Sequence, residues 1–258
     1  MKKIAAIVLA VAAAFALAGC AKSAKKSNKF VLGLDDSFPP MGYRDADNNI
    51  VGYDIDLAKE VTKRLGLELV CQPIDWSAKE MELKTGKIDC IWNGLTMTEE
   101  RQKEMEFSEA YLENAQVVVV RADSGIKTLA DLSGKKVGVQ AGSSAQDAMD
   151  AATEFKASLK EVVEFQENVT ALNDLEIKSI DGVVMDLIVA NYSIQQGKKD
   201  YVVLEETLAP EKYGIAFSKS NKALRDSVQK ALEEMAKDGT LAEITKSWFG
   251  SDISKIGK

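Results

Sequence analysis

Residues 88–111 read IDCIWNGLTMTEERQKEMEFSEAY, and this stretch decides the fold class of the chain. Its first five residues form a short, mostly apolar run that predicts a buried strand of a parallel sheet. An Asn-Gly pair interrupts the run, and Thr98 then stands where it can cap a helix whose first turn carries two Glu residues. A strand, a loop and a helix in this order are typical of α/β proteins.

Arg101 falls one turn into the predicted helix, where a side chain leans back toward the helix N-terminus. Its guanidinium therefore points to the carboxyl end of the strand, which is where open α/β sheets bind ligands. A guanidinium beside the free N–H groups of a loop and a helix start suits a carboxylate. The alternative is a surface Arg paired with Glu104 or Glu106, and this stretch alone favours neither interpretation.

The same alternation of strands and helices continues on both sides of this stretch and predicts a mostly parallel sheet. We expect a helix that Asp54 or Asp56 caps and that ends at residue 65, and another over residues 79–85. Further strands are expected at residues 30–34, 67–74, 136–139, 160–165 and 180–184, and further helices from residue 145, at 169–177 and after residue 186.

Two segments of the chain resemble each other. Residues 82–93 and 176–186 both consist of the end of a helix, a tight break, a buried strand and a polar residue where the strand ends. So short a match can arise by chance in any α/β protein. Together with the repeated order of strands, it favours two similar lobes.

The last part of the chain predicts how the lobes are joined. Residues 117–120 and 213–217 are extended runs, and the helices at 221–237 and after a Thr240 cap have no strands of their own. We therefore expect the chain to cross at residues 116–121 and to return at 213–217, which gives a two-strand hinge. Residues 30–117 and 214–258 are assigned to the first lobe, and residues 118–213 to the second.

The N-terminus predicts export. Residues 1–19 have the basic start, apolar centre and small-residue cleavage site of a signal peptide, and the apolar run is shorter than the about 20 residues of a membrane helix. The LAGC tetrapeptide that ends at Cys20 resembles the lipobox of bacterial lipoproteins, which implies a lipid on the Cys20 thiol; an ordinary signal with a chance Cys is the alternative. Residues 20–29 are polar and rich in lysine and predict a flexible tether.

Composition excludes several kinds of function. The chain has 40 Asp and Glu against 33 Lys and Arg, which argues against nucleic acid as a partner. It has no His, which excludes His-based triads and His-ligated metal sites, and we expect neither a metal nor a cofactor. Cys71 and Cys90 are predicted on strands about 9–10 Å apart, beyond the about 7 Å reach of a disulfide, so we expect two buried free thiols.

Seven short motifs resemble one protein family in the family's own order. They are GYDIDLA at 52–58, IDW at 74–76, GKID at 86–89, TMTEER at 96–101, FSEAY at 107–111, VGVQAGSS at 137–144 and YGIAF at 213–217. Together they resemble the extracellular solute-binding proteins of family 3, the amino-acid-binding components of ABC importers, and WNG at 92–94 resembles a branch for polar amino acids. The resemblance implies a two-lobed, type II periplasmic-binding-protein-like fold.

The resemblance also implies a site for the two charged groups of an amino acid. Arg101 would hold the α-carboxylate, helped by the N–H groups of Thr96 and Ser144. Asp186 would take the α-ammonium, together with the carbonyl of Gly94 and the hydroxyl of Thr96. Donors for the carboxylate and acceptors for the ammonium would select the zwitterion.

Four further positions are implied to contact the side chain of the ligand: Asp35, Phe38, Trp76 and Gln140. Phe38 and Trp76 would enclose the amino acid, with core packing as the alternative. Asp35 would read a cationic or amide side chain, or would only anchor its own loop. The chain has Phe38 where the family often has Tyr, and Met41 where an aromatic residue is common.

The simplest alternative for three site residues is helix capping. Asp186, Ser143 and Ser144 each stand before a predicted helix, where Asp and Ser commonly cap. Each residue alone favours the cap, whereas Arg101 and the two-lobe symmetry favour a role in ligand binding.

The function implied is transport without catalysis. A free L-amino acid would close the lobes, and the permease of an ABC importer would recognise the closed form. We expect a monomer outside the cytoplasm, anchored to the membrane through the lipid on Cys20. One rival is an enzyme on the same fold, resembling cyclohexadienyl dehydratase. It would need a general acid in the cleft, but the sequence places no Glu there, and Glu154 or Glu167 are only guesses. The other rival is a sensory ligand-binding protein.

Overall fold

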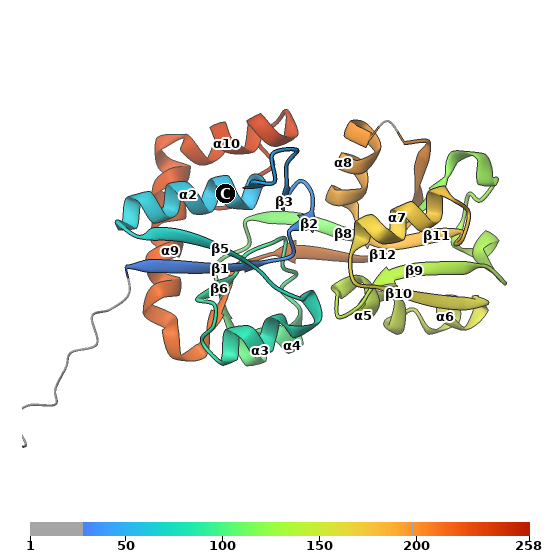
Figure 1. Ribbon diagram of the computed structural model, residues 1–258, viewed down its shortest axis with the longest axis horizontal. Helices are drawn as coiled ribbons and strands as arrows, with labels where there is room; N and C mark the ends of the chain where they lie inside the picture. The colour runs from blue at the N-terminus through green and yellow to red at the C-terminus, as the bar shows by residue number, and fades with distance from the viewer. Residues whose placement is uncertain (1–27, 198) are drawn as a thin grey trace, which may run out of the picture.

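In the computed structural model, which describes residues 28–197 and 199–258, two five-stranded sheets form the centres of two lobes (Figure 1). The predicted leader, Cys20 and most of the predicted tether lie outside the described residues. The first lobe contains β1 (Lys29–Leu34), β2 (Ser37–Phe38), β3 (Gly42–Arg44), β4 (Ile50–Val51), α2 (Tyr53–Leu65), β5 (Glu68–Pro73), α3 (Lys79–Lys84), β6 (Cys90–Ile91), α4 (Glu99–Glu104), β7 (Met105–Phe107), β13 (Ala216–Ser218), α9 (Lys222–Asp238) and α10 (Thr240–Phe249). The second lobe contains β9 (Lys136–Gln140), α5 (Ser144–Ala151), α6 (Thr153–Ser158), β10 (Glu161–Phe165), α7 (Asn168–Glu176), β11 (Gly182–Asp186) and α8 (Leu187–Gly197), and the long strands β8 (Leu112–Arg121) and β12 (Tyr201–Tyr213) complete its sheet.

The two sheets have equivalent topologies. Their strand orders are β5-β1-β6-β13-β7 and β10-β9-β11-β8-β12. In each sheet the first three strands are parallel and the fourth runs antiparallel to its neighbours. Helices cover both faces of each sheet (Figure 1), as the alternation of strands and helices in the sequence predicts.

The sequence repeat corresponds to the same hydrogen bonds in both lobes. Oδ2 of Asp89 accepts from the N–H of Val31 at 2.7 Å, and the N–H of Asp89 donates to the carbonyl of Val31 at 2.8 Å. Asp181 makes the same pair of contacts with Lys136, at 3.0 and 2.8 Å. The Ile-Asp dipeptides of the two lobes therefore start equivalent strands in the same way.

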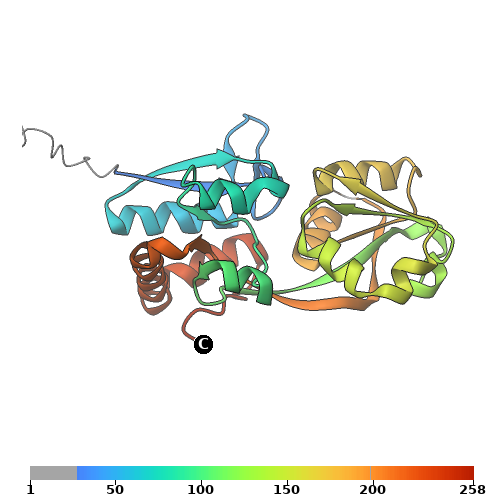
Figure 2. The same ribbon diagram turned by 90° about the horizontal axis from the view of Figure 1, so that it is seen from below.

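The lobes are joined by β8 and β12, which pair antiparallel (Figure 2). Residues 116–120 of β8 pair with β11 in the second sheet, and residues 216 and 217 after β12 pair with β6 in the first. The crossing therefore lies at residues 112–115 and 210–213. The predicted crossings at 116–121 and 213–217 are a few residues late, because the apolar run that suggested the first of them is buried in the second sheet.

That apolar run shows why an uninterrupted series of Val residues forms a strand here. Val117 and Val119 face one hydrophobic cluster and Val118 and Val120 face another, and all four are at most 1% exposed. A strand covered on both faces gains from apolar side chains at every position. Burying each Val contributes about 1.5–3 kcal/mol relative to exposing it.

Two of the predicted helix caps are wrong. Neither Asp54 nor Asp56 caps α2: its N-cap is Gly52, with φ 146° and no side-chain cap bond. Only glycine fits there, because a Cβ would lie 2.2 Å from the carbonyl oxygen of Met41. The last helix is capped by Gly239, and Thr240 is its first residue.

The predicted positions of the cysteines are confirmed. Cys71 and Cys90 both pair with Leu32, from opposite sides of β1, and both are free thiols. Cys90 is buried as predicted, whereas Cys71 is partly exposed. Among the described residues, no helix is both long enough and apolar enough to cross a membrane.

Candidate functional site

A small cavity lies between the two lobes. Its lining consists of Asp35, Phe38, Trp76, Gly94, Thr96, Arg101, Gln140, Ser143, Ser144 and Asp186. Every residue expected to contact a ligand is therefore found here, together with Ser143. The cavity lies where the carboxyl ends of β1, β6, β9 and β11 meet, as expected of parallel sheets.

Arg101 is held by backbone groups of both lobes. Thr98 caps α4 as predicted, with its Oγ1 accepting from the N–H of Arg101 at 3.2 Å. The guanidinium donates to the carbonyl of Thr96 at 3.2 Å and, across the lobes, to the carbonyl of Gly142 at 3.4 Å. It is 8% exposed, and its carboxylate neighbour is Glu80 at 3.6 Å.

The predicted alternative of Arg101 paired with Glu104 or Glu106 is wrong, because among the described residues its ion pair is with Glu80. Glu106 lies 3.7 Å from Arg225 instead. Arg101 lines the cavity from the first turn of α4, which begins at Glu99 directly after the Thr98 cap.

The N-terminus of α5 faces Arg101 from the second lobe. Ser143 is the cap of this helix, with its Oγ accepting from the N–H of Gln146 at 3.2 Å. Ser144 is the first helical residue, and its Oγ lies 3.0 Å from the hydroxyl of Thr96. The capping alternative therefore holds for Ser143 and not for Ser144. Free N–H groups at a helix start and the helix dipole favour an anion.

Asp186 is the last residue of β11 and a buried carboxylate. Its Oδ1 accepts from Nδ2 of Asn114 at 2.6 Å, from Nε2 of Gln116 at 3.0 Å and from the hydroxyl of Tyr213 at 2.5 Å. Burial raises the pKa of Asp186 to about 7, and the negative charge of Glu211 adds to this shift.

Capping does not account for Asp186 either. The N–H of Ile188, in the first turn of α8, donates to Oδ1 of Asn114 at 3.3 Å. The side chain that serves this helix start comes from the hinge strand β8, while the carboxylate of Asp186 lines the cavity.

Asp35 both anchors its own loop and reaches the second lobe. Its Oδ1 accepts from the N–H of Ser37 at 2.9 Å, and its Oδ2 accepts from Nε2 of Gln140 at 2.7 Å. Oε1 of Gln140 accepts in turn from Asn168 at 3.0 Å. Burial is the main cause that raises the pKa of Asp35 to about 6.

The aromatic residues of the first lobe divide between its core and the cavity. Trp92 is fully buried in the core of the first lobe, whereas Trp76 and Phe38 line the cavity with 8% and 5% exposure. Both also belong to hydrophobic clusters, and that of Phe38 extends into the second lobe, so core packing and cavity lining are combined in each. The ammonium of Lys79 lies 5.0 Å from the centre of the Trp76 ring.

Gly94 reaches the cavity because a buried acid holds its backbone. Oδ2 of Asp54 accepts from the N–H of Gly94 at 2.8 Å and from the hydroxyl of Tyr111 at 2.9 Å. Gly94 has φ 59°, and a Cβ would lie 3.0 Å from the ring of Phe38 and 3.2 Å from that of Tyr213. Burial raises the pKa of Asp54 to about 7.

Sequence reasoning missed two buried residues beside the cavity, Lys79 and Gln116. Lys79, 2% exposed, donates to the carbonyl of Gly142 at 2.8 Å, and burial lowers its pKa to about 8, with Arg101 contributing. Nothing in the local pattern distinguishes this lysine from its helical neighbours. Gln116 donates to Asp186 and Ser144, and here a signal existed: Asn114 and Gln116 are polar residues at a spacing of two, beside an apolar strand.

Comparison with known proteins identifies the family of the chain. Residues 30–251 match the bacterial extracellular solute-binding proteins, family 3. The chain belongs to this family. It is 33% identical over 259 residues to the arginine-binding extracellular protein ArtP of Bacillus subtilis (strain 168), covering 96% of this chain and 98% of that protein. It is 30% identical over 249 residues to the L-cystine-binding protein TcyJ of Escherichia coli (strain K12), covering 93% and 90%.

A solved structure extends the family assignment to the fold. The substrate-binding protein of an ABC uptake transporter from Streptococcus pneumoniae, with bound histidine, superposes with a TM-score of 0.86 at 38% identity and covers 88% of this chain and 95% of that one. The type II periplasmic-binding fold predicted from the sequence is thereby confirmed. In this family-3 protein the cavity lies between the two lobes.

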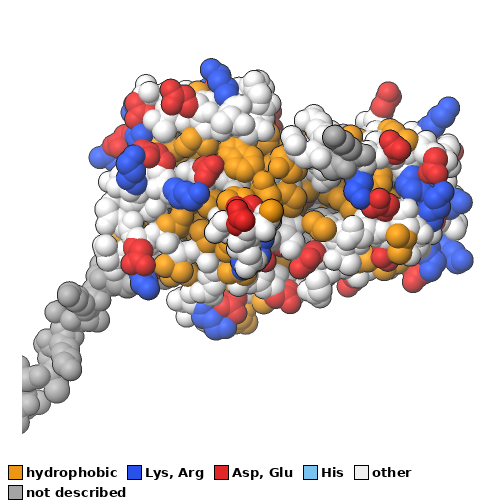
Figure 3. Space-filling model, turned by 45° about the horizontal axis from the view of Figure 1, so that its top comes forward, with side chains coloured by type: hydrophobic (Ala, Val, Ile, Leu, Met, Phe, Trp, Pro, Cys, Tyr) orange, Lys and Arg blue, Asp and Glu red, His pale blue; other side chains and the backbone are white. Residues whose placement is uncertain are grey.

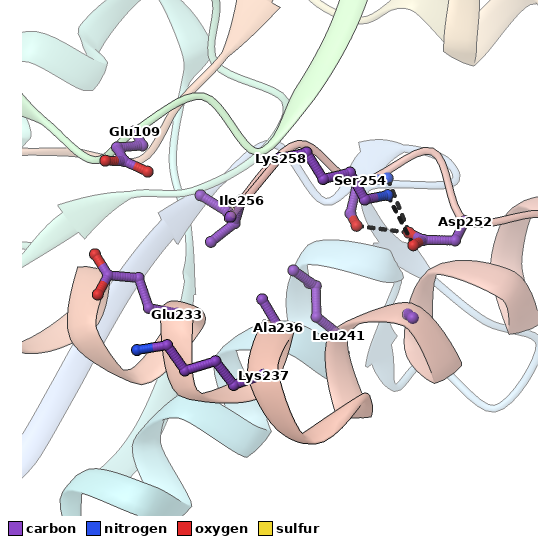
Figure 4. Close-up of a pocket in the computed structure, with 11 residues that line it drawn as sticks. Glu109, Glu233, Ala236, Lys237, Leu241, Asp252, Ser254, Ile256 and Lys258 are labelled. Carbon is purple, nitrogen blue, oxygen red and sulfur yellow. Dashed lines mark hydrogen bonds and ion pairs between the residues drawn. The ribbon is translucent and has the colours of Figure 1, made fainter.

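A second hollow lies apart from this site. It is on the first lobe near the C-terminus, with Asp252, Ser254 and Lys258 in its lining (Figure 4). These side chains are paired with each other, since the carboxylate of Asp252 accepts hydrogen bonds from the hydroxyl of Ser254 and the ammonium of Lys258. It offers no set of donors or acceptors that converge on a ligand.

Proposed function

We propose that this family-3 protein binds a free, polar L-amino acid between its lobes and delivers it to the permease of an ABC importer. The observation that carries the proposal is the pair Arg101 and Asp186. They come from different lobes, have opposite charges and line one cavity. The named relatives bind arginine, cystine or histidine, which supports an amino acid as the ligand.

The two ends of the cavity suit the two ends of an amino acid. Arg101 and the N–H groups of Thr96 and Ser144 are donors and would hold the α-carboxylate. Asp186, the hydroxyl of Thr96 and the carbonyl of Gly94 are acceptors and would hold the α-ammonium. A molecule that lacks either charge would leave one buried group unpaired, at a cost of several kcal/mol.

The remaining wall would contact the ligand side chain. Phe38 and Trp76 supply apolar surface from the first lobe, and Gln140 supplies an amide from the second. Asp35 lies on the same wall, and its carboxylate is held only by the N–H of Ser37 and the amide of Gln140 among the described contacts. A cationic or amide side chain would satisfy Asp35 best.

Closure is the physical basis of delivery. Contacts between the lobes include Gln140 with Asp35 at 2.7 Å and Lys79 with Gly142 at 2.8 Å. A ligand that touches both lobes favours the closed form, since its contacts are complete only there. The permease would then distinguish loaded from empty protein by shape.

The location and organisation of the protein follow from the same proposal. The lipid on Cys20 and the tether 20–29 would hold a monomer near the outer side of the cell membrane. We propose two lobes close to the predicted bounds, 30–117 with 214–258 and 118–213, with the first crossing moved to residues 112–115. The protein would be a carrier and not an enzyme: neither Glu154, which is exposed, nor Glu167 lines the cavity.

A thermal-shift screen of the purified mature protein against the standard amino acids tests this function. Bound ligand stabilises the folded state by about 2.7 kcal/mol at one hundred times its dissociation constant. We expect polar amino acids to raise the melting temperature and apolar ones to leave it unchanged. If no amino acid shifts the transition, or if prephenate or arogenate is turned over, the carrier proposal is wrong.

A further inference from the structure

A groove on the hinge side of the molecule adjoins the ligand cavity. We call it the rear groove; its lining includes Thr96 and Ser144, which also line the cavity, and Asn114 and Glu211 of the hinge strands. The two hollows are thus separated by a thin layer of polar side chains. Glu211, on β12, belongs to that layer and is half-buried.

Glu211 shares its hydrogen-bond donors with Asp186. Oε2 of Glu211 accepts from Nδ2 of Asn114 at 3.1 Å and from Nε2 of Gln116 at 2.9 Å. The same two amide nitrogens donate to Oδ1 of Asp186 at 2.6 and 3.0 Å. Two carboxylates are therefore held side by side, which is unfavourable unless a cation is nearby.

Glu211 also determines the direction of a chain of hydroxyl groups between the lobes. Oγ1 of Thr96 lies 2.9 Å from Oε2 of Glu211, and a carboxylate can only accept, so the Thr96 hydroxyl donates to it. The proton between Ser144 and Thr96, whose oxygens are 3.0 Å apart, must then come from Ser144. Nε2 of Gln116 donates to Ser144 at 3.3 Å and completes the chain.

This direction leaves the hydroxyl of Thr96 with one remaining function toward a ligand. Its proton is used by Glu211 and one lone pair is used by Ser144, so what it still offers is a lone pair. Thr96 can therefore accept a hydrogen bond from an ammonium but cannot donate one.

We propose that Glu211 is a positioning residue of the ammonium site, which adds a second negative charge beside Asp186 and fixes Thr96 as an acceptor. This inference rests on the proposed function, because it assumes a ligand with a protonated α-amine. It names what the site selects: a protonated amine over a hydroxyl at the same position of the ligand. Glu211 itself lines the rear groove and acts through Thr96, Asn114 and Gln116.

The two carboxylates also determine how binding depends on pH. Apart from Glu211, the titratable groups around Asp186 are Tyr213 of β12 and, across the cavity, Arg101 and Asp35. The rear groove adds Glu113 of β8, Asp147 of α5 and Lys212 of β12. An ammonium requires ionised Asp186, so amino-acid affinity rises with pH while that carboxyl loses its proton. Without the charge of Glu211, Asp186 ionises at lower pH, and the rise moves to lower pH with it.

Calorimetry of the wild type and of Glu211→Gln tests this. The titrants are the amino acid that the screen selects, with L-arginine as the first choice, and the same compound with a hydroxyl in place of the α-ammonium. We expect Glu211→Gln to raise the dissociation constant for the amino acid about tenfold at pH 8, and less at pH 5.5. We expect it to leave that of the hydroxy compound within about twofold.

Two further variants separate charge from folding. Glu113→Gln removes another acid of the rear groove, on β8 and paired with Lys255 at 2.9 Å, and should match the wild type. Glu211→Asp keeps the negative charge, so the pH dependence of its amino-acid affinity should match that of the wild type. The inference is overturned if Glu211→Gln leaves the affinity for the amino acid unchanged at pH 8. It is also overturned if the variant weakens binding of both compounds by the same factor at every pH. A wild type that binds no amino acid instead overturns the proposed function.

Discussion

Replacing Arg101 by Ala tests the interaction on which the proposed function depends. Among the described residues that line the cavity, Arg101 is the one basic side chain, and it is 8% exposed. A ligand carboxylate beside it would be out of contact with bulk water. The substitution therefore leaves the ligand with a buried charge and without its main partner.

The size of the effect follows from this burial. Removing one partner of a buried ion pair is destabilising by about 3–5 kcal/mol. The N–H groups at the start of α5 remain and interact with an anion by about 0.3–1 kcal/mol. We therefore expect Arg101→Ala to weaken amino-acid binding by about 3–4 kcal/mol, or roughly two to three orders of magnitude in the dissociation constant. Arg101→Lys keeps the charge without the planar fork and should lie in between.

Titration calorimetry at neutral pH measures this change directly. Arg64→Ala is the matched control: Arg64 is also an ion-paired arginine of the first lobe, bound to Glu60 and Asp238, but it lies on α2 away from the cavity. Thermal melts of the ligand-free variants would show whether Arg101→Ala is still folded. A folded Arg101→Ala protein whose dissociation constant is within threefold of the wild type would refute the assignment of the carboxylate site.

Three further predictions concern closure, pH and the thiols. Gly142→Ala should weaken binding without unfolding the protein, measured by calorimetry and thermal melts, because its Cβ would lie 3.1 Å from Cα of Ser77 across the lobes and φ is 68°. The free energy of unfolding, measured by denaturant titration, should fall as pH rises from about 4 to 7, and it should fall less in Asp54→Asn. The reason is that the pKa of Asp54 is raised to about 7 in the folded protein, so its carboxyl stabilises the fold while it is protonated and this stabilisation is lost when it ionises. Alkylation of the folded protein followed by mass spectrometry should modify Cys90 far more slowly than Cys71, since burial raises the pKa of both thiols but only Cys71 is partly exposed; equal rates would contradict the structure.

The sequence predicted the parts of the fold that depend on repeated apolar patterns. The run at residues 117–120 and the parallel strands of both sheets were found because burial on both faces requires apolar side chains in sequence. The order of the strands allowed the two lobes to be inferred. The residue at which a strand ends has no such regular pattern. The sequence therefore predicted the crossings of the hinge a few residues later in the chain than the structure has them.

Local chemistry was harder to predict where a tertiary contact decides it. Asp54 stands where an acid commonly caps a helix, yet its carboxylate binds Gly94 and Tyr111, which are distant in sequence. Lys79 has the sequence context of a surface helix residue, but it is 2% exposed and its ammonium binds the carbonyl of Gly142 in the second lobe. Glu211 carries no signal at all, because its partners come from other strands and loops.

The equivalent topology of the lobes explains why each lobe supplies one of the two opposite charges that line the cavity. β6 and β11 occupy the same place in their sheets, and each ends at the cavity. After β6 the chain continues through a loop to α4, which supplies Arg101; at the same point β11 ends in Asp186. One structural unit used twice therefore supplies a cation in one lobe and an anion in the other.

The hinge strands connect this pair of charges to the movement of the lobes. Asp186 is held by Asn114 and Gln116 of β8 and by Tyr213 of β12, which lie at or beside the crossing. A change in the crossing would therefore move the donors of the proposed ammonium site as well as the lobes. Because both events use the same side chains, a substitution at Gln116 should alter ligand affinity and the fraction of closed protein together. Small-angle scattering of ligand-free Gln116→Ala, compared with its calorimetric affinity, would refute this coupling if one changed without the other.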